Sequence, residues 1–166
     1  MGLYTRAVMA LTRSEAAVPL VHNIVVPLDR RIFKATKGRM SLTHLGTSLK
    51  HNALHDLLLT TTGKRSGKQR STPVLFLDHD GGYVIVGSRY GTDSHPHWTA
   101  NLLAKPEATV LVRGREERVT ARRLTQQEVD DLWPRLLELY PNWADYRERT
   151  DREFRAFHLT PVAVAS

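Results

Sequence analysis

Residues 72–88 read TPVLFLDHDGGYVIVGS and contain the signal that decides the fold. Two apolar runs, at 72–77 and 83–88, flank the turn sequence HDGG at 79–82. Apolar runs of this length, bounded by turn residues, are typical of buried strands. Glycine reaches positive φ without strain, so the centre of the stretch can reverse direction tightly. The stretch therefore predicts a β-hairpin.

Short apolar runs bounded by turn residues also occur on both sides of this hairpin. Residues 56–61 form another short apolar run, and residues 154–159 are expected to form a last strand. Residues 109–114 contain another short apolar run, and residues 116–122 place polar side chains in alternation with Val119 and Ala121. Together they predict a second hairpin with one face in water. Short strands joined by tight turns, with few helices between them, favour a mainly β (α+β) fold built on an antiparallel sheet or small barrel.

Helices are expected between the later strands. Residues 96–104 begin with Pro96, and proline is favoured at a helix start, where its missing amide costs nothing. Thr125 and Glu128 have the spacing of a capping box, and a helix with apolar residues at spacings of three and four should run to about Tyr140. A short helix is expected over 143–149.

Length and composition indicate one main domain. The chain has 166 residues, and its hydrophobic content of 41% is enough to build a core. We expect residues 1–50 to form an N-terminal helical segment and residues 51–166 to form the β domain. The chain contains no cysteine, which excludes disulfides, thiolate metal sites and thiol nucleophiles. Because such a chain suits a reducing compartment, the protein is expected to be cytoplasmic.

The apolar segment 18–28 is cut by prolines and is too short to span a bilayer. Because arginines flank it, it could lie on a membrane surface as a peripheral contact, or pack as a helix on the β domain.

Residues 60–73 form a basic stretch between two apolar runs. The spacing of its glycines does not match a triphosphate-binding P-loop, and a strand follows where that motif has a helix. Gly63 and Gly67 could still turn backbone amides toward an anion. The stretch predicts a site for a phosphorylated or polycarboxylate ligand, with a solvated basic turn as the alternative. Its four cations are Lys64, Arg65, Lys68 and Arg70.

Other chemical signals are weak. His95 and His97 near Asp93 have no adjacent third strong ligand, and His51 with His55 lacks the glutamate of a metalloprotease helix, so no metal site is expected. No nucleophile elbow or Ser-His-Asp set is evident. The basic and aromatic residues lie in separate elements, which argues against nucleic acid as a partner.

Four stretches occur in order and at consistent spacing: LLTTTGKRSGKQRSTP (58–73), VIVGSR (84–89), HPHWTANL (95–102), and the pair WP (133–134) with YP (140–141). Together they resemble the deazaflavin-dependent nitroreductase and quinone reductase family of actinobacteria. This resemblance implies a split β-barrel related to FMN-binding oxidoreductases, with residues 51–166 binding the deazaflavin coenzyme F(420).

The resemblance also implies roles for individual residues. The cofactor's phosphate and acidic tail would be held by Lys64, Arg65, Ser66, Gly67 and Arg70, with help from Lys68. Its ring would lie beside Thr72, Pro73, Val86, Gly87, Ser88 and Arg89, under His97, Trp98 and Asn101. The substrate would contact Leu75, Tyr140, Trp143 and Tyr146, and Ser88 and Tyr146 are the candidate proton donors.

The implied activity is hydride transfer from reduced F(420) to a quinone, nitroaromatic or conjugated carbonyl acceptor. The family more often has Arg-Lys at Lys64-Arg65, which keeps the charge, and Pro at Gln69. It more often has tyrosine at Leu75, Thr99 and Trp143. The resemblance implies that these departures leave cofactor binding intact and bear on the choice of substrate. The alternatives are an FMN-binding oxidoreductase of the same fold, or a non-catalytic binder of lipid, haem or nucleic acid. FMN is the weaker choice because it lacks the acidic tail that four cations would bind. The protein is expected to be a monomer or a homodimer.

Overall fold

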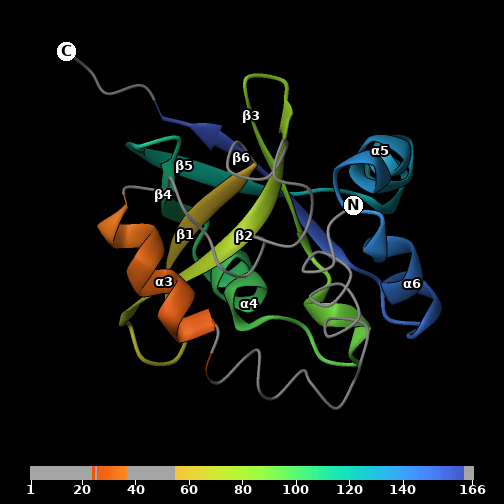
Figure 1. Cartoon of the computed structure of the whole chain (residues 1–166), viewed down its shortest axis with the longest axis horizontal. Helices are drawn as coiled ribbons and strands as arrows, with labels where there is room; N and C mark the ends of the chain where they lie inside the picture. Colours follow the sequence, from red (N-terminus) through yellow and green to blue (C-terminus); the bar gives the residue numbers. More distant parts are fainter. Residues whose placement is uncertain (1–23, 25, 37–54, 163–166) are drawn as a thin grey trace, which may run out of the picture.

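Six strands close into one antiparallel barrel in the order β1-β2-β3-β6-β5-β4, with β4 returning to β1 (Figure 1). The computed structural model describes residue 24, residues 26–36 and residues 55–162. The strands are β1 (Asp56–Thr62), β2 (Gln69–His79), β3 (Gly82–Gly87), β4 (Glu107–Val112), β5 (Arg115–Arg123) and β6 (Arg155–Pro161). The helices are α3 (Val26–Ala35), α4 (His97–Ala104), α5 (Gln126–Leu139) and α6 (Asn142–Glu148), with a 3-10 turn η4 (Arg89–Gly91). The predicted antiparallel barrel is confirmed.

Both predicted hairpins are present. In the first, β2 and β3 pair from Phe76 with Ile85 to His79 with Gly82, which leaves a two-residue turn. Asp80 and Gly81 both have positive φ, at 46° and 70°, as a two-residue hairpin turn of the right twist requires. The turn chemistry visible in the sequence thus sets the register of the strands that carry the site.

The connection between β1 and β2 is shorter than expected. The two strands pair as far as Thr62 with Gln69, so the loop covers only residues 63–68. The predicted strands at 56–61 and 72–77 left residues 62–71 to join them. Thr62, Gln69, Arg70 and Ser71 are strand residues instead, so the strands were predicted too short at these ends. Threonine is β-branched and fits a pleated ladder well, which explains why the polar flanks of the apolar runs stay in the sheet.

Apolar residues form two cores on opposite faces of β2 and β3. Val74 and Phe76 point into the barrel, whereas Leu75 and Leu77 face a second core built with α5 and α6. Successive side chains of a strand point to opposite faces, so a strand covered on both sides is apolar throughout. This explains the continuous apolar runs at 72–77 and 83–88, and it places α5 and α6 beside the outer face of β3.

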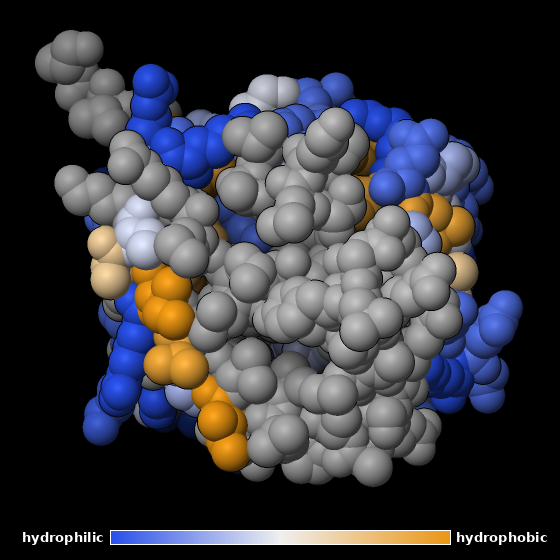
Figure 2. Space-filling model, in the orientation of Figure 1, coloured by the Kyte–Doolittle hydropathy of each residue, from blue (hydrophilic) through white to orange (hydrophobic). Residues whose placement is uncertain are grey.

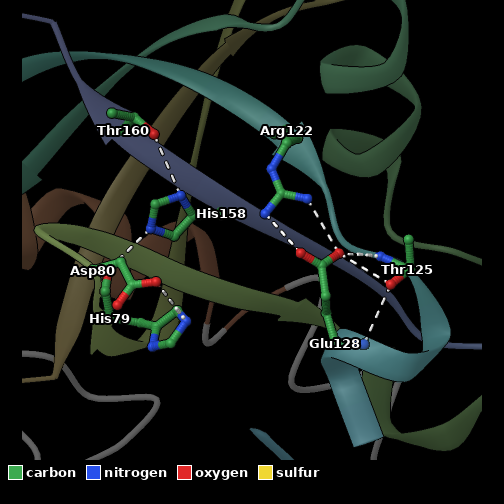
Figure 3. Close-up of polar contacts among 7 residues, drawn as sticks. All are labelled: His79, Asp80, Arg122, Thr125, Glu128, His158 and Thr160. Atoms are coloured by element: carbon green, nitrogen blue, oxygen red, sulfur yellow. Dashed lines mark hydrogen bonds and ion pairs between the residues drawn. The ribbon is translucent and has the colours of Figure 1, made fainter. Parts of the chain in front are cut away.

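The predicted capping box starts α5. Thr125 Oγ1 accepts a hydrogen bond from the Glu128 amide at 3.2 Å, and Glu128 Oε2 accepts one from the Thr125 amide at 2.7 Å (Figure 3). Arg122 on β5 donates to both carboxylate oxygens of Glu128, at 2.8 and 3.1 Å. These bonds lower the pKa of Glu128 to about 2, chiefly through Arg122. The helix start is thereby tied to the barrel.

Most of the expected N-terminal segment lies outside the described residues, including most of 18–28. The described part contains α3, which packs on the outside of β1 and β2 through the fully buried Phe33 (Figure 1). Ile24 and Leu28 are exposed, and apolar surface follows α3 in Figure 2. Among the described residues no helix is long and apolar enough to cross a membrane.

Candidate functional site

Two hollows meet at the side of the barrel where β2, β3 and α4 come together. The first, which we call the chamber, lies between β2, the end of β3, η4, α4 and α6; its walls include Pro73, Val86, Pro96 and Tyr90. The second, which we call the groove, runs along the β1–β2 loop and α4. Both are lined by Thr72, His97 and Trp98, so they adjoin through a common wall.

The structure brings most of the predicted site residues to these two hollows. The chamber is lined by Thr72, Pro73, Leu75, Val86, Ser88, Arg89, His97, Trp98, Tyr140, Trp143 and Tyr146. The groove is lined by Lys64, Arg65, Ser66, Arg70 and Asn101 as well as the shared residues. Gly67, Lys68 and Gly87 line neither hollow. An apolar chamber beside a cationic groove can hold a ligand that has a flat ring at one end and negative charge at the other.

The loop of the groove is closed by its own backbone. The Gly63 amide donates to the Lys68 carbonyl and the Gly67 amide donates to the Gly63 carbonyl, each at 2.8 Å. The expectation that these two glycines turn their amides toward an anion was therefore wrong. Gly67 has a φ of +65°, so it is needed for the turn itself. Charge recognition in the groove falls to side chains, of which Lys64, Arg65 and Arg70 are exposed.

Gly87 acts through close packing. A Cβ atom at this position would lie 2.7 Å from Cγ2 of Thr99 and 3.0 Å from the Arg155 carbonyl oxygen. The absence of a side chain therefore lets α4 approach the end of β3. Because Ser88 follows on one side and Trp98 precedes Thr99 on the other, this contact sets the width of the chamber.

Ser88 is oriented by an aromatic neighbour. Nε1 of Trp143 donates a hydrogen bond to Ser88 Oγ at 3.1 Å. An indole N–H can only donate, so this bond occupies a lone pair of the serine oxygen and leaves the hydroxyl hydrogen for another acceptor. Trp143 is 3% exposed and stacks edge-on against Tyr140. The indole thus fixes Ser88 at the chamber wall with its hydrogen available.

The two tyrosines of the chamber are linked to each other. The hydroxyls of Tyr140 and Tyr146 lie 3.1 Å apart, and Asn142 Nδ2 donates to the Tyr140 hydroxyl at 3.3 Å. Tyr146 is 1% exposed, so its hydroxyl sits deep in the second core. Of the two predicted proton donors, Ser88 therefore lies in the less buried position.

Arg152 lines neither hollow but supports the edge of the chamber, and the sequence did not reveal this role. Its guanidinium donates to the Ser88 carbonyl at 2.7 Å, to the Thr92 carbonyl at 2.9 Å and to the Gly87 carbonyl at 3.3 Å. It also donates to Nδ1 of His95 at 2.9 Å. Since Arg152 stays protonated, that nitrogen of His95 must be the acceptor. Arg152 thus ties the segment after α6 to the end of β3 and to the loop that leads into α4.

Burial and nearby cations govern the electrostatics at this edge. The pKa of His95 is lowered from its usual value, first by burial and then by Arg155 and Arg152. Burial also lowers the pKa of Arg152, with further contributions from Arg155 and Arg89. Arg89 itself donates to Ser94 Oγ at 2.8 Å, so its guanidinium is held at the chamber rim by the loop. The edge of the chamber is consequently positive, which favours a ligand with negative charge.

The histidines around the chamber do not form a metal centre. Within residues 26–36 and 55–162, His, Asp and Glu side chains make no group of three that could hold a metal ion. His51, one half of the other histidine pair considered, lies outside the described residues.

Comparisons with known proteins agree on one family. The family model described as F(420)H(2)-dependent quinone reductase matches residues 30–161. An F(420)H(2)-dependent quinone reductase of Mycobacterium tuberculosis is 30% identical over 136 residues, which cover 80% of this chain and 87% of the relative.

Two solved structures match a large part of the chain, and one of them is named as a reductase of this kind. The F(420)-H2 dependent reductase FDR-A is 35% identical, with a TM-score of 0.57, and the match covers 63% of this chain and 92% of that one. A chain described as a domain-swapped dimer is 28% identical, with a TM-score of 0.60 and coverage of 80% and 96%.

Proposed function

The chain belongs to the F(420)H(2)-dependent quinone reductase family, and from this premise we propose that the chamber and the groove hold coenzyme F(420) for hydride transfer to a quinone. It is an oxidoreductase, and its cofactor is F(420). The observation that carries the proposed site is the wall shared by an apolar chamber and a cationic groove, at Thr72, His97 and Trp98. A deazaflavin ring fits the first hollow and an acidic tail fits the second.

Different residues bind the ring and the acidic tail of this ligand. Pro73 and Val86 present apolar surface to one part of the ring, and Trp98 adds to the lining from α4. Lys64, Arg65 and Arg70 supply charge-assisted hydrogen bonds to phosphate and carboxylate groups, which are stronger than neutral ones. The tail therefore sets the affinity and the chamber sets the orientation.

Reduced F(420) supplies the hydride when it is bound, and the protein has to orient the acceptor and handle one proton. Reduction of a quinone by two electrons adds a hydride and a proton and gives the hydroquinone. Ser88 Oγ is the atom best placed to offer a hydrogen to the acceptor's oxygen, because Trp143 already occupies one of its lone pairs. Tyr140, Trp143 and Tyr146 exclude water from the same wall.

The experiment follows oxidation of reduced F(420) with menadione as acceptor. Wild-type protein should oxidise it in a protein-dependent manner, and Ser88→Ala should lower kcat while leaving the dissociation constant of F(420) unchanged. A Ser88→Ala enzyme with the wild-type kcat would overturn the role of Ser88. A wild-type protein that oxidises no reduced F(420) with menadione, a nitroaromatic or a conjugated carbonyl would overturn the proposed activity.

We also propose that the protein forms a homodimer. The support is the likeness to a solved chain described as a domain-swapped dimer, which matches 80% of this chain. Light scattering on the purified protein should give twice the 18.8 kDa of one chain, and a single-chain mass would contradict the proposal. The cytoplasmic location, the peripheral membrane contact and the domain boundary near residue 50 stay predictions.

A further inference from the structure

Asn101 on α4 has both ends of its side-chain amide engaged within the protein. The backbone amide of Lys64, the second residue of the loop, donates to Asn101 Oδ1 at 2.9 Å. Asn101 Nδ2 in turn donates to Oγ1 of Thr61, the next-to-last residue of β1, at 2.9 Å. Because a backbone N–H can only donate, it identifies the oxygen of the amide and fixes how the group is oriented.

This pair of bonds is a long-range connection. It joins positions 37 and 40 residues apart in the chain and bridges α4 to the start of the loop. The backbone bonds of the loop, from Gly63 to Lys68 and from Gly67 to Gly63, are internal to it. Asn101 is 7% exposed, so loss of either partner would leave a buried polar group unpaired. The connection therefore holds the loop in one position against α4.

We propose that Asn101 is a positioning residue, which fixes the loop of residues 63–68 so that Lys64 and Arg65 face the groove, and that it does not recognise the cofactor by direct contact. This inference rests on the proposed function, because the loop matters only if the groove receives an acidic tail. A loop that must order itself on binding reduces affinity, since the free energy spent on ordering is subtracted from the binding free energy. A loop already held by Asn101 avoids that cost.

The test compares two ligands on four proteins. The ligands are F(420) and the deazaflavin riboside that lacks the phosphate and the glutamates. The proteins are wild type, Asn101→Leu, Thr61→Val and the control Thr99→Val. Thr99 is a fully buried residue of α4, and its hydroxyl donates to the Pro96 carbonyl at 2.8 Å, so the control loses a buried bond that does not involve the loop.

Thr61→Val loses one buried hydrogen bond and should weaken F(420) binding by about tenfold. Asn101→Leu loses both bonds and should weaken it by at least as much. Both should change the affinity for the tail-less riboside less than about twofold, because the chamber is untouched. Thr61 lines the groove but is only 1% exposed, and its Oγ1 already accepts the bond from Asn101 Nδ2. Valine keeps the size of this side chain and removes only that bond, so an effect of Thr61→Val is transmitted through Asn101. This variant also carries the test if Asn101→Leu does not fold.

A second readout needs no ligand. The Lys64 amide should be protected from hydrogen exchange in the wild type and in Thr99→Val, and should lose that protection in Asn101→Leu. Three results would overturn the inference: equal weakening of both ligands, unchanged F(420) affinity in Thr61→Val, or an unprotected Lys64 amide in the wild type. Wild-type protein that binds neither ligand, yet protects the Lys64 amide, would instead show that the proposed function is wrong.

Discussion

Replacing Arg152 by methionine should destabilise the protein and disturb the chamber together. The side chain makes three hydrogen bonds of 2.9 Å or less, to the Ser88 carbonyl, the Thr92 carbonyl and Nδ1 of His95. Each such bond contributes about 1 kcal/mol after exchange with water, so the variant should lose about 3 kcal/mol of unfolding free energy. Arg152→Lys keeps the charge but cannot bridge all three acceptors, so it should recover only part of the loss.

Urea unfolding gives the stability, and steady-state kinetics with menadione gives the effect on the site. Because Arg152 holds the carbonyls of Gly87 and Ser88, kcat should fall in Arg152→Met even at temperatures where the protein stays folded. Arg123→Met is a matched control, since its ion pair with Glu153 is exposed and should be worth less than about 1 kcal/mol. If Arg152→Met were no less stable than this control, the reasoning about the chamber edge would be refuted.

Three further changes test other parts of the structure. Gly87→Ala places a Cβ 2.7 Å from its nearest neighbour and should cost about 1–3 kcal/mol in urea unfolding. Trp143→Phe removes the bond to Ser88, so kcat with menadione should fall about fivefold while KM for reduced F(420) changes little. The pKa of Glu128 is lowered from 4.5 to about 2, so its stabilisation is present above pH 4.5 and is lost as the pH falls toward 2. Glu128→Gln should therefore lower Tm at pH 7, and the difference from wild type should shrink in acid.

A specific result would contradict each of these three predictions. A Gly87→Ala variant with the unfolding free energy of the wild type would mean that α4 does not approach β3 as closely as described. A Trp143→Phe variant with the wild-type kcat would show that the indole does not orient Ser88. A Tm difference for Glu128→Gln that stays constant from pH 7 to pH 2 would mean that the charge of Glu128 does not stabilise the start of α5.

Local chemistry made much of the barrel predictable. The Asp80-Gly81 turn and the capping box of Thr125 and Glu128 depend only on neighbours in the chain, and both are present. The apolar runs of β2 and β3 were recognised because both faces of these strands are covered. Most of the residues that the resemblance named line the chamber or the groove, since it compares motifs at consistent spacing, and their roles in binding stay predictions.

Contacts between distant segments were not predictable in the same way. Arg152 contacts carbonyls 60 to 65 residues earlier, and a backbone carbonyl carries no sequence signature. The amide of Asn101 reaches back 37 residues to Lys64, so the residue expected to contact the cofactor has its amide bonded within the protein. The polar strand ends at Thr62 and Gln69 were taken as loop for a related reason, because their pairing depends on the partner strand.

The central claim is that the chamber and the groove together bind F(420), and the most direct test is a pair of dissociation constants. Wild-type protein should bind F(420) more tightly than FMN, because FMN has no acidic tail to occupy the groove. The double variant Arg65→Ala/Arg70→Ala should lose at least about tenfold in F(420) affinity while its fold and its affinity for the tail-less riboside persist. Tighter binding of FMN, or unchanged F(420) affinity in the double variant, would contradict the account.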